Sequence, residues 1–148
     1  MKPIRTWVVV ADGARAVLLL NEGPGKGLTP LTGELRQPAK PTREIGTDRP
    51  GRVQESADSS RHAMEPRVDW HRFEKQHFAE KIAAMLDTAA EKKEMDRIVL
   101  VAPAKTLGDL RKAINGQTAA LVRNEVAKDL TNLKPHELVA HLGSVVVL

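Results

Sequence analysis

Half of the chain's arginines lie in one segment, residues 36–69, which contains a single lysine, Lys40. These arginines are Arg36, Arg43, Arg49, Arg52, Arg61 and Arg67. A guanidinium offers a planar fork of donors that matches phosphate or carboxylate, so the enrichment indicates anion recognition rather than mere solubility. Six acidic residues bring the net charge of the segment close to zero, and a self-solvating, disordered loop is therefore the competing interpretation.

Prolines and glycines interrupt the same segment so often that no regular element of ordinary length fits between them. They are Pro38, Pro41, Gly46, Pro50, Gly51 and Pro66. We therefore expect one long, mobile loop over residues 36–69. Structureless loops of more than about 15 residues in a compact domain are usually either functional or disordered.

Residues that could support metal chemistry are sparse. A two-metal nuclease needs several carboxylates that converge near the centre of a sheet. Asp12 and Glu125 are the only strand-associated candidates for such a site, and a turn role explains Asp12. The five histidines show no ligand spacing, and the chain has no cysteine for a thiolate site or a thiol nucleophile. We expect no metal, no cofactor and no catalytic residue.

Composition predicts one domain over residues 1–148 with an aliphatic core. The chain is 41% hydrophobic but has only two tryptophans, two phenylalanines and no tyrosine, which weighs against RNA binding by base stacking. A net charge of +4 permits an anionic partner. The apolar run 7–11 is too short for a signal peptide or a membrane span, so we expect a cytoplasmic protein that does not contact membranes.

The elements that would position these residues begin with strands. Residues 6–11 and 14–20 read as a hairpin around Asp12-Gly13, a dipeptide that supplies positive φ in tight turns. Residues 28–35, which contain Pro30 and Gly33, suit an edge strand. After the loop, an amphipathic pattern predicts a helix over residues 70–93 with Asp69 as its N-cap.

The second half alternates strands and helices. Residues 98–102 and 121–126 read as strands, and residues 104–114 as a helix that stops at Asn115-Gly116. A last helix from Pro135 to Gly143 precedes an apolar tail, which forms an edge strand or pairs with another chain. This order predicts a mixed sheet with helices packed on it.

Several motifs together resemble the bacterial host attachment protein family. They are Trp7-Val-Val-Val-Ala-Asp-Gly-Ala-Arg-Ala16, Asp48-Arg-Pro-Gly-Arg52, Arg61-His-Ala-Met-Glu-Pro-Arg67, Ile98-Val-Leu-Val-Ala-Pro103, Leu107-Gly-Asp-Leu-Arg111 and Val126-Ala-Lys-Asp-Leu-Thr131. That family is similar to the central domain of class-one translation release factors and of Pelota. The resemblance implies an α/β, ribonuclease-H-like mixed sheet of five strands in the order 3-2-1-4-5, with helices packed on it.

The resemblance also gives the 36–69 segment a place in the fold. In the release factors the connection between the third strand and the first long helix carries the Gly-Gly-Gln tripeptide that enters the peptidyl transferase centre. No such tripeptide occurs in residues 36–69, and Asn115-Gly-Gln117 follows the second helix, where we interpret it as a helix cap. The resemblance therefore implies a Pelota-like role that occupies or senses a ribosome without hydrolysis.

Three functions remain as hypotheses. The first is a non-catalytic protein that binds the ribosome or structured RNA. Its candidate phosphate contacts are Arg43, Arg49, Arg52, Arg61, Arg67, Lys105 and Arg111. The second is a protein required for attachment to host cells that acts through protein partners, and the third is a metal-dependent nuclease. The oligomeric state stays open.

Overall fold

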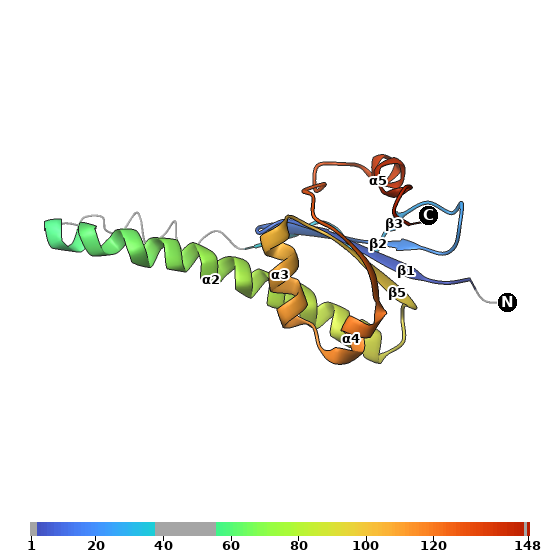
Figure 1. The fold of residues 1–148 in the computed structure, drawn as a ribbon, viewed down its shortest axis with the longest axis horizontal. Helices are drawn as coiled ribbons and strands as arrows, with labels where there is room; N and C mark the ends of the chain where they lie inside the picture. Colours follow the sequence, from blue (N-terminus) through green and yellow to red (C-terminus); the bar gives the residue numbers. More distant parts are fainter. Residues whose placement is uncertain (1–2, 38–55, 147) are drawn as a thin grey trace.

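The computed structural model describes the backbone of residues 3–37, 56–146 and 148, and the side chains of the same residues except 56–71. Arg43, Arg49 and Arg52 lie outside the described residues. The described elements form a mixed sheet with helices on both of its faces (Figure 1).

The first two strands form the predicted hairpin. β1 (Thr6–Ala11) pairs antiparallel with β2 (Arg15–Asn21) along its whole length. Both strands have neighbours on both sides in the sheet, and most of their side chains are buried. This explains why their sequences are almost continuously apolar, as expected for strands that are covered on both faces.

The hairpin turn depends on Asp12 rather than on glycine. Its carboxylate Oδ1 accepts hydrogen bonds from the backbone N–H groups of Ala14, at 2.8 Å, and Arg15, at 2.9 Å. Gly13 does not have the positive φ that the sequence predicts. The aspartate side chain therefore replaces a backbone turn hydrogen bond, which removes the need for a left-handed residue.

The remaining strands extend the sheet on both sides of this hairpin. β5 (Arg97–Val101) pairs parallel with β1, and β6 (Val122–Val126) pairs parallel with β5. β3 (Thr29–Pro30) and β4 (Leu35–Arg36) both pair antiparallel with β2. The order is β3-β2-β1-β5-β6, with β4 beside β3 on the same edge of β2.

This arrangement confirms the predicted α/β fold and its 3-2-1-4-5 order, with one difference in strand number. The sequence predicts a single third strand over 28–35, whereas the structure divides it into β3 and β4, so that the sheet has six strands. The backbone bends between them at residues 31–33. Pro30 has no N–H to donate to the ladder, and Gly33 weakens strand pairing, which accounts for the division.

The helix α2 (Ser56–Glu91) is much longer than predicted. The prediction of a loop over all of residues 36–69 is wrong for 56–69, and Asp69 lies inside the helix instead of capping it. Between Gly51 and Pro66 the sequence has no glycine or proline and several good helix formers. A single interior proline removes one hydrogen bond and permits the helix to continue as a kinked or strained element. The amino-terminal part of α2 projects beyond the sheet (Figure 1).

One face of the sheet is covered by the carboxyl-terminal part of α2, by α3 (Ala104–Ala113) and by α4 (Gly116–Leu121) (Figure 1). Apolar side chains from β1, β2 and β5 meet those of the helices in one buried cluster. The cluster includes Val9, Leu18, Ile82, Leu86, Leu100 and Leu110. The aliphatic composition of this layer agrees with the scarcity of aromatic residues in the sequence.

The other face is covered by α5 (Pro135–Leu142) and by the end of the chain. Val146 and Leu148 are each only 8% exposed and belong to the core of this layer. The backbone N–H of Gly25 donates to the carbonyl of Leu148 at 2.9 Å. The described residues of the apolar tail therefore pack on the chain's own sheet and add no strand to it.

The predicted helix over 104–114 is confirmed as α3, but the segment that follows it differs. Asn115, predicted to stop that helix, is the N-cap of α4, and its side-chain oxygen accepts from the backbone N–H of Thr118 at 2.9 Å. Asparagine is among the strongest N-cap residues, which explains a new helix at this point.

Candidate nucleic-acid interface

A cavity of about 520 Å³ opens at the edge of the sheet where the parallel strands β1 and β5 end. Three parts of the fold meet there: the β1–β2 turn, one turn of α2 and the start of α3. The residues that line it are Asp12, Gly13, Ala14, Gln37, Arg72, Glu74, Lys75, Pro103, Lys105 and Thr106. We call it the carboxyl-end pocket. In open α/β sheets, ligands bind outside the carboxyl ends of the parallel strands.

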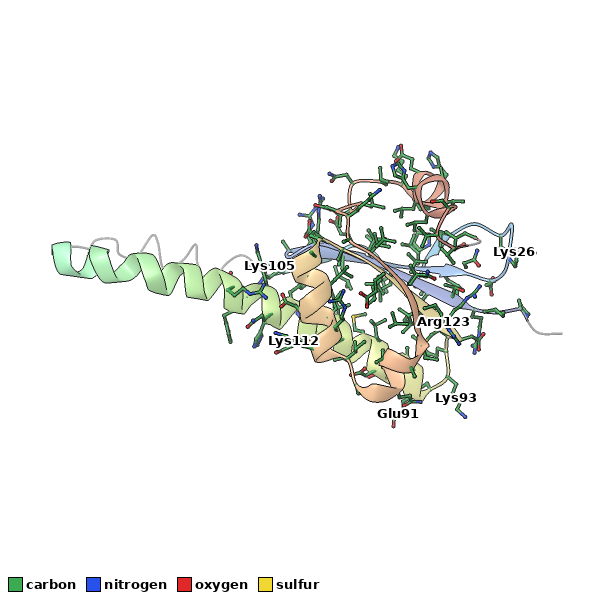
Figure 2. The ribbon with its side chains drawn as sticks, viewed as in Figure 1. Lys26, Glu91, Lys93, Lys105, Lys112 and Arg123 are labelled. Atoms are coloured by element: carbon green, nitrogen blue, oxygen red, sulfur yellow. The ribbon has the colours of Figure 1, made fainter. Side chains whose placement is uncertain are left out.

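Two exposed lysines from different helices reach this pocket. Lys75 comes from α2 and Lys105 from the first turn of α3. A Cβ atom on residue 13 would lie 2.9 Å from Cδ of Lys75, so Gly13 leaves room for the lysine stem to cross the hairpin turn. Figure 2 shows Lys105 at the amino-terminal end of α3, beside α2. No hydrogen-bond partner of either ammonium group is found among the described residues.

A buried ion pair fixes the two helices beside the pocket. The guanidinium of Arg72 donates two hydrogen bonds to the carboxylate of Asp109, at 2.6 and 3.0 Å. The Asp109 side chain is only 6% exposed, and that of Arg72 is 34% exposed. The bidentate geometry fixes α2 against α3, so Arg72 acts as a structural residue at this pocket.

The carboxylate of Asp12 is likewise bound by neighbouring groups. Besides its two backbone bonds, its carboxylate lies 3.4 Å from Nε of Arg15. Partial burial acts to raise the pKa of Asp12, but the backbone N–H groups of Ala14 and Arg15 and the Arg15 guanidinium outweigh it and lower the pKa below its ordinary value. Asp12 is thus a charged turn residue whose negative charge is offset within the turn.

The first turn of α3, from which Lys105 and Thr106 line the pocket, has donors without partners among the described residues. Its N-cap is Pro103, which makes no side-chain capping bond, and the first turn has no acidic residue. The backbone N–H groups of Ala104, Lys105 and Thr106 lack intrahelical partners because of their position. Thr106 is 8% exposed, and its hydroxyl has no hydrogen-bond partner in the described part of the chain.

The sequence-predicted contacts have separate outcomes. Lys105 lines the carboxyl-end pocket as an exposed cation. Arg111 lies elsewhere on α3, where its Nη2 donates to Oε1 of Glu125 at 2.5 Å. That hydrogen bond and the charge of Glu125 raise the pKa of Arg111. Arg61 and Arg67 lie on α2 rather than in a loop, and their side chains are outside the described residues.

Sequence reasoning missed Lys75, Arg72 and Thr106 as residues of this site. The amphipathic pattern of residues 70–93 indicates only that Lys75 belongs to the polar face of a helix. The available signal was the register of the fold: the run after Val101 follows a buried parallel strand, where ligand sites cluster. The approach of α2 to that edge depends on tertiary packing and has no local signature.

The side chains considered for metal chemistry do not gather. Asp12 is engaged by Arg15, and Glu125 by Arg111. Among the described side chains, no three histidine, cysteine, aspartate or glutamate residues lie close enough to hold a metal ion together. Across the described part of the chain, no helix is long and apolar enough to cross a membrane.

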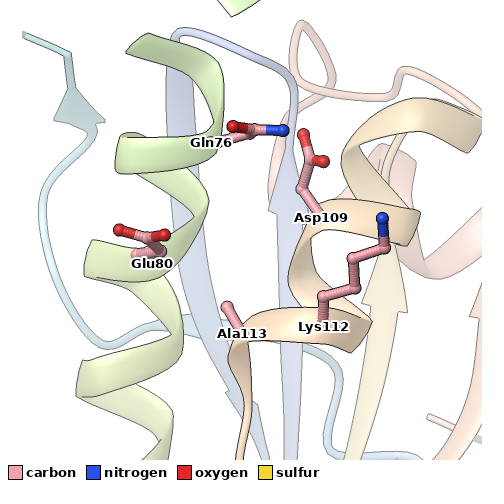
Figure 3. A pocket seen from close by; sticks show the side chains of 5 residues that line it. All are labelled: Gln76, Glu80, Asp109, Lys112 and Ala113. Atoms are coloured by element: carbon pink, nitrogen blue, oxygen red, sulfur yellow. The ribbon is translucent and has the colours of Figure 1, made fainter. Parts of the chain in front are cut away.

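Two other cavities have different surroundings. A larger one of about 1,050 Å³, the amino-end pocket, lies where β1 and β5 begin, and its lining includes Arg5, Lys93, Asp96, Arg97 and Arg123. A small one of about 230 Å³ lies between α2 and α3 (Figure 3). Figure 3 shows Gln76 and Lys112 beside Asp109, the carboxylate that already binds Arg72. This small cavity is a gap beside a structural ion pair.

Two solved structures with a similar fold are archaeal proteins. One is described as the crystal structure of archaeal translation termination factor, aRF1; it has a TM-score of 0.54 and 14% identity, and the match covers 97% of this chain and 35% of that one. Another, described as an archaeal protein, has a TM-score of 0.50 and 16% identity, and the match covers 93% of this chain and 34% of that one. This chain thus spans about a third of their length.

These structural similarities confirm the release-factor-like fold predicted from the sequence, and at such low identity they concern the fold alone. No curated protein matches the chain. A family with the description "Protein required for attachment to host cells" matches residues 7–142, nearly the whole sequence. The chain belongs to this family.

Proposed function

We propose that this protein is a non-catalytic RNA-binding protein that contacts the ribosome or another structured RNA through the carboxyl-end pocket and the arginine-rich segment. One observation carries the proposal: Lys75 and Lys105 line the same pocket as Gln37. Gln37 is the last described residue before the segment that holds Arg43, Arg49 and Arg52. Cations from two helices thus line one pocket, together with the residue at which the described part of the chain before residue 38 ends.

The chemistry of RNA binding suits this arrangement. Phosphate contacts need only positive charge and hydrogen-bond donors, and they supply most of the affinity in non-specific binding. The fold is shared with a protein described as a translation termination factor, which supports the ribosome as the source of the RNA. Arg111 contributes less than Lys105 in this proposal, because Glu125 already neutralises it.

The absence of catalysis is part of the proposal. The two strand-associated carboxylates have arginine partners, and the sequence lacks the Gly-Gly-Gln tripeptide. A carboxylate whose charge is offset by an adjacent guanidinium is a poor candidate for assembling two metal ions.

Sedimentation with purified ribosomes at low and high salt tests the proposal. We expect co-sedimentation at low salt that falls steeply as salt rises, since binding releases counterions from the RNA. The double variant Lys75→Gln/Lys105→Gln should reduce the slope of the logarithm of the binding constant against the logarithm of the salt concentration by about two, because two phosphate contacts are lost. Absence from the ribosomal fraction at every salt concentration, together with no binding to a structured RNA, would contradict the proposal.

The family description supports a second candidate, a role in attachment to host cells through protein partners. The two candidates differ in their dependence on RNA. Treatment of a cell extract with ribonuclease before affinity purification should release the partners in the first case and leave them bound in the second. Partners retained equally by the wild type and the double lysine variant would favour the attachment role.

A further inference from the structure

We infer that the first turn of α3 holds one phosphate group, with the Thr106 hydroxyl as the central donor. This inference rests on the proposed function and names the chemical group of the RNA that the carboxyl-end pocket takes. The group would lie between the start of α3 and the ammonium groups of Lys75 and Lys105, which line the same pocket.

The state of Thr106 carries the inference. Thr106 lines the pocket and the residue is only 8% exposed, yet the described residues offer its hydroxyl no hydrogen-bond partner. Buried hydroxyls are nearly always paired, because an unpaired one loses its bonds to water without replacement. Thr118, the other buried threonine in a helix, has its partner in Asp87 at 2.5 Å. The hydroxyl of Thr106 is therefore available to donate a hydrogen bond to a ligand in the pocket.

The start of the helix explains why that ligand is an anion. The backbone N–H groups of Ala104, Lys105 and Thr106 have no hydrogen-bond partner among the described residues, and Pro103 supplies no capping side chain. The positive end of the helix dipole and these N–H groups together form a phosphate-binding arrangement. Most helices place an acidic residue or a cap at this position, whereas α3 places Lys105 there.

The carboxylates around the pocket leave this position open to an anion. Asp12 is bound by two backbone N–H groups and by Arg15. The carboxylate of Asp109, on α3, is bound by the guanidinium of Arg72, on α2. Glu74, the other carboxylate of the lining, comes from α2.

Titration of the isotopically labelled protein with inorganic phosphate tests this inference. We expect the amide resonances of residues 104–106 to shift with a common dissociation constant. Thr106→Val, which keeps the shape but removes the hydroxyl, should weaken phosphate binding about tenfold, as for a lost hydrogen bond to a charged group. Thr106→Ser, which restores the hydroxyl, should bind within about twofold of the wild type and serves as the control for folding.

The same variants separate this inference from the proposed function. If RNA binding is present but Thr106→Val binds RNA and phosphate as the wild type does, the phosphate site is wrong and the RNA-binding role stands. If phosphate shifts residues 104–106 and Thr106→Val abolishes the shift, while no RNA or ribosome binds, the site is correct and takes a free phosphate or a phosphorylated small molecule. A 5′-phosphorylated and an unphosphorylated oligonucleotide distinguish a terminal phosphate from a backbone phosphate.

Discussion

The two ends of the sheet are both lined by cations, but these cations have different tasks. At the amino end, Arg5 lies 3.4 Å from Asp96 and also donates to the carbonyl of Lys93 at 2.8 Å. Arg97 donates to the hydroxyl of Thr6 at 2.9 Å. At the carboxyl end, Lys75 and Lys105 have no such bonds among the described residues.

This difference shows that the volume of a pocket and the charge of its lining do not by themselves identify a binding site. The amino-end pocket is about twice as large as the carboxyl-end pocket, at about 1,050 against 520 Å³. Two of its arginines, Arg5 and Arg97, hold β1 to β5 and to the end of α2. The carboxyl end instead collects unpaired donors and the start of the arginine-rich segment, and these are the groups that a ligand can use.

The largest expected effect concerns the structural pair beneath the carboxyl-end pocket. Asp109→Ala should destabilise the protein by about 3 kcal/mol, because it leaves the guanidinium of Arg72 partly buried without its partner. Asp96→Ala at the amino end should cost about 1 kcal/mol or less, since the Arg5–Asp96 pair is exposed, at 39% and 46% for the two side chains. Urea unfolding of both variants measures this difference, and equal losses would contradict it.

RNA affinity should separate the two ends directly. Lys75→Gln/Lys105→Gln should weaken RNA binding about a hundredfold at low salt, at about tenfold for each charged contact. Lys93→Gln/Arg123→Gln removes the same charge at the opposite end of the sheet, where Figure 2 shows Lys93 and Arg123, and should change affinity less than about threefold. Fluorescence anisotropy with a labelled structured RNA measures both. Equal losses would mean that net charge, not the carboxyl-end pocket, determines binding.

The two buried threonines of the helices offer a finer comparison. Thr118→Val removes the bond to Asp87 and should lower the free energy of unfolding by about 1–3 kcal/mol, as for a hydrogen bond to a charged group, with RNA binding unchanged. Thr106→Val should change the stability by less than about 0.5 kcal/mol, because it breaks no hydrogen bond to any described residue. Thermal unfolding tests both, and a large loss of stability for Thr106→Val would indicate an internal role for its hydroxyl.

Much of this fold could be predicted because its signals are local. The hairpin, β5, α3 and α5 follow from apolar runs and from Pro135 at the first position of its helix. The start of α2 could not be predicted, because Pro66 is a local breaker whereas the helix depends on the whole stretch from residue 56. The positive φ expected at Gly13 also failed, since the side chain of Asp12 makes the turn.

The candidate site was harder to predict than the fold. The sequence predicts Lys105 and Arg111 alike as phosphate contacts, but Arg111, on the same helix, is bound by Glu125 on β6. Whether a cation is free depends on contacts between residues far apart in the sequence. Lys75 and Thr106 meet only because α2 crosses the end of β1, and no local pattern encodes that crossing.

The smallest expected effect concerns Asp12, a carboxylate that lines the same pocket as the proposed phosphate site. Its folded pKa lies below the ordinary value, so its charge stabilises the fold above about pH 4, the pKa of an unfolded aspartate. This contribution is lost as the pH falls through the folded pKa. Asp12→Asn keeps the turn acceptor but loses the charge, and should cost less than about 1 kcal/mol at pH 7.

The unfolding curves of the wild type and Asp12→Asn should therefore converge as the pH is lowered below about 4. Phosphate binding at neutral pH gives a second measure of how strongly the charge of Asp12 acts on a bound anion. If the Arg15 guanidinium and the turn N–H groups offset the charge of Asp12, the substitution should strengthen phosphate binding by less than about twofold, because an already compensated charge repels weakly. A tenfold gain would show that Asp12 opposes the ligand, and would place the anion against the β1–β2 turn instead of the first turn of α3.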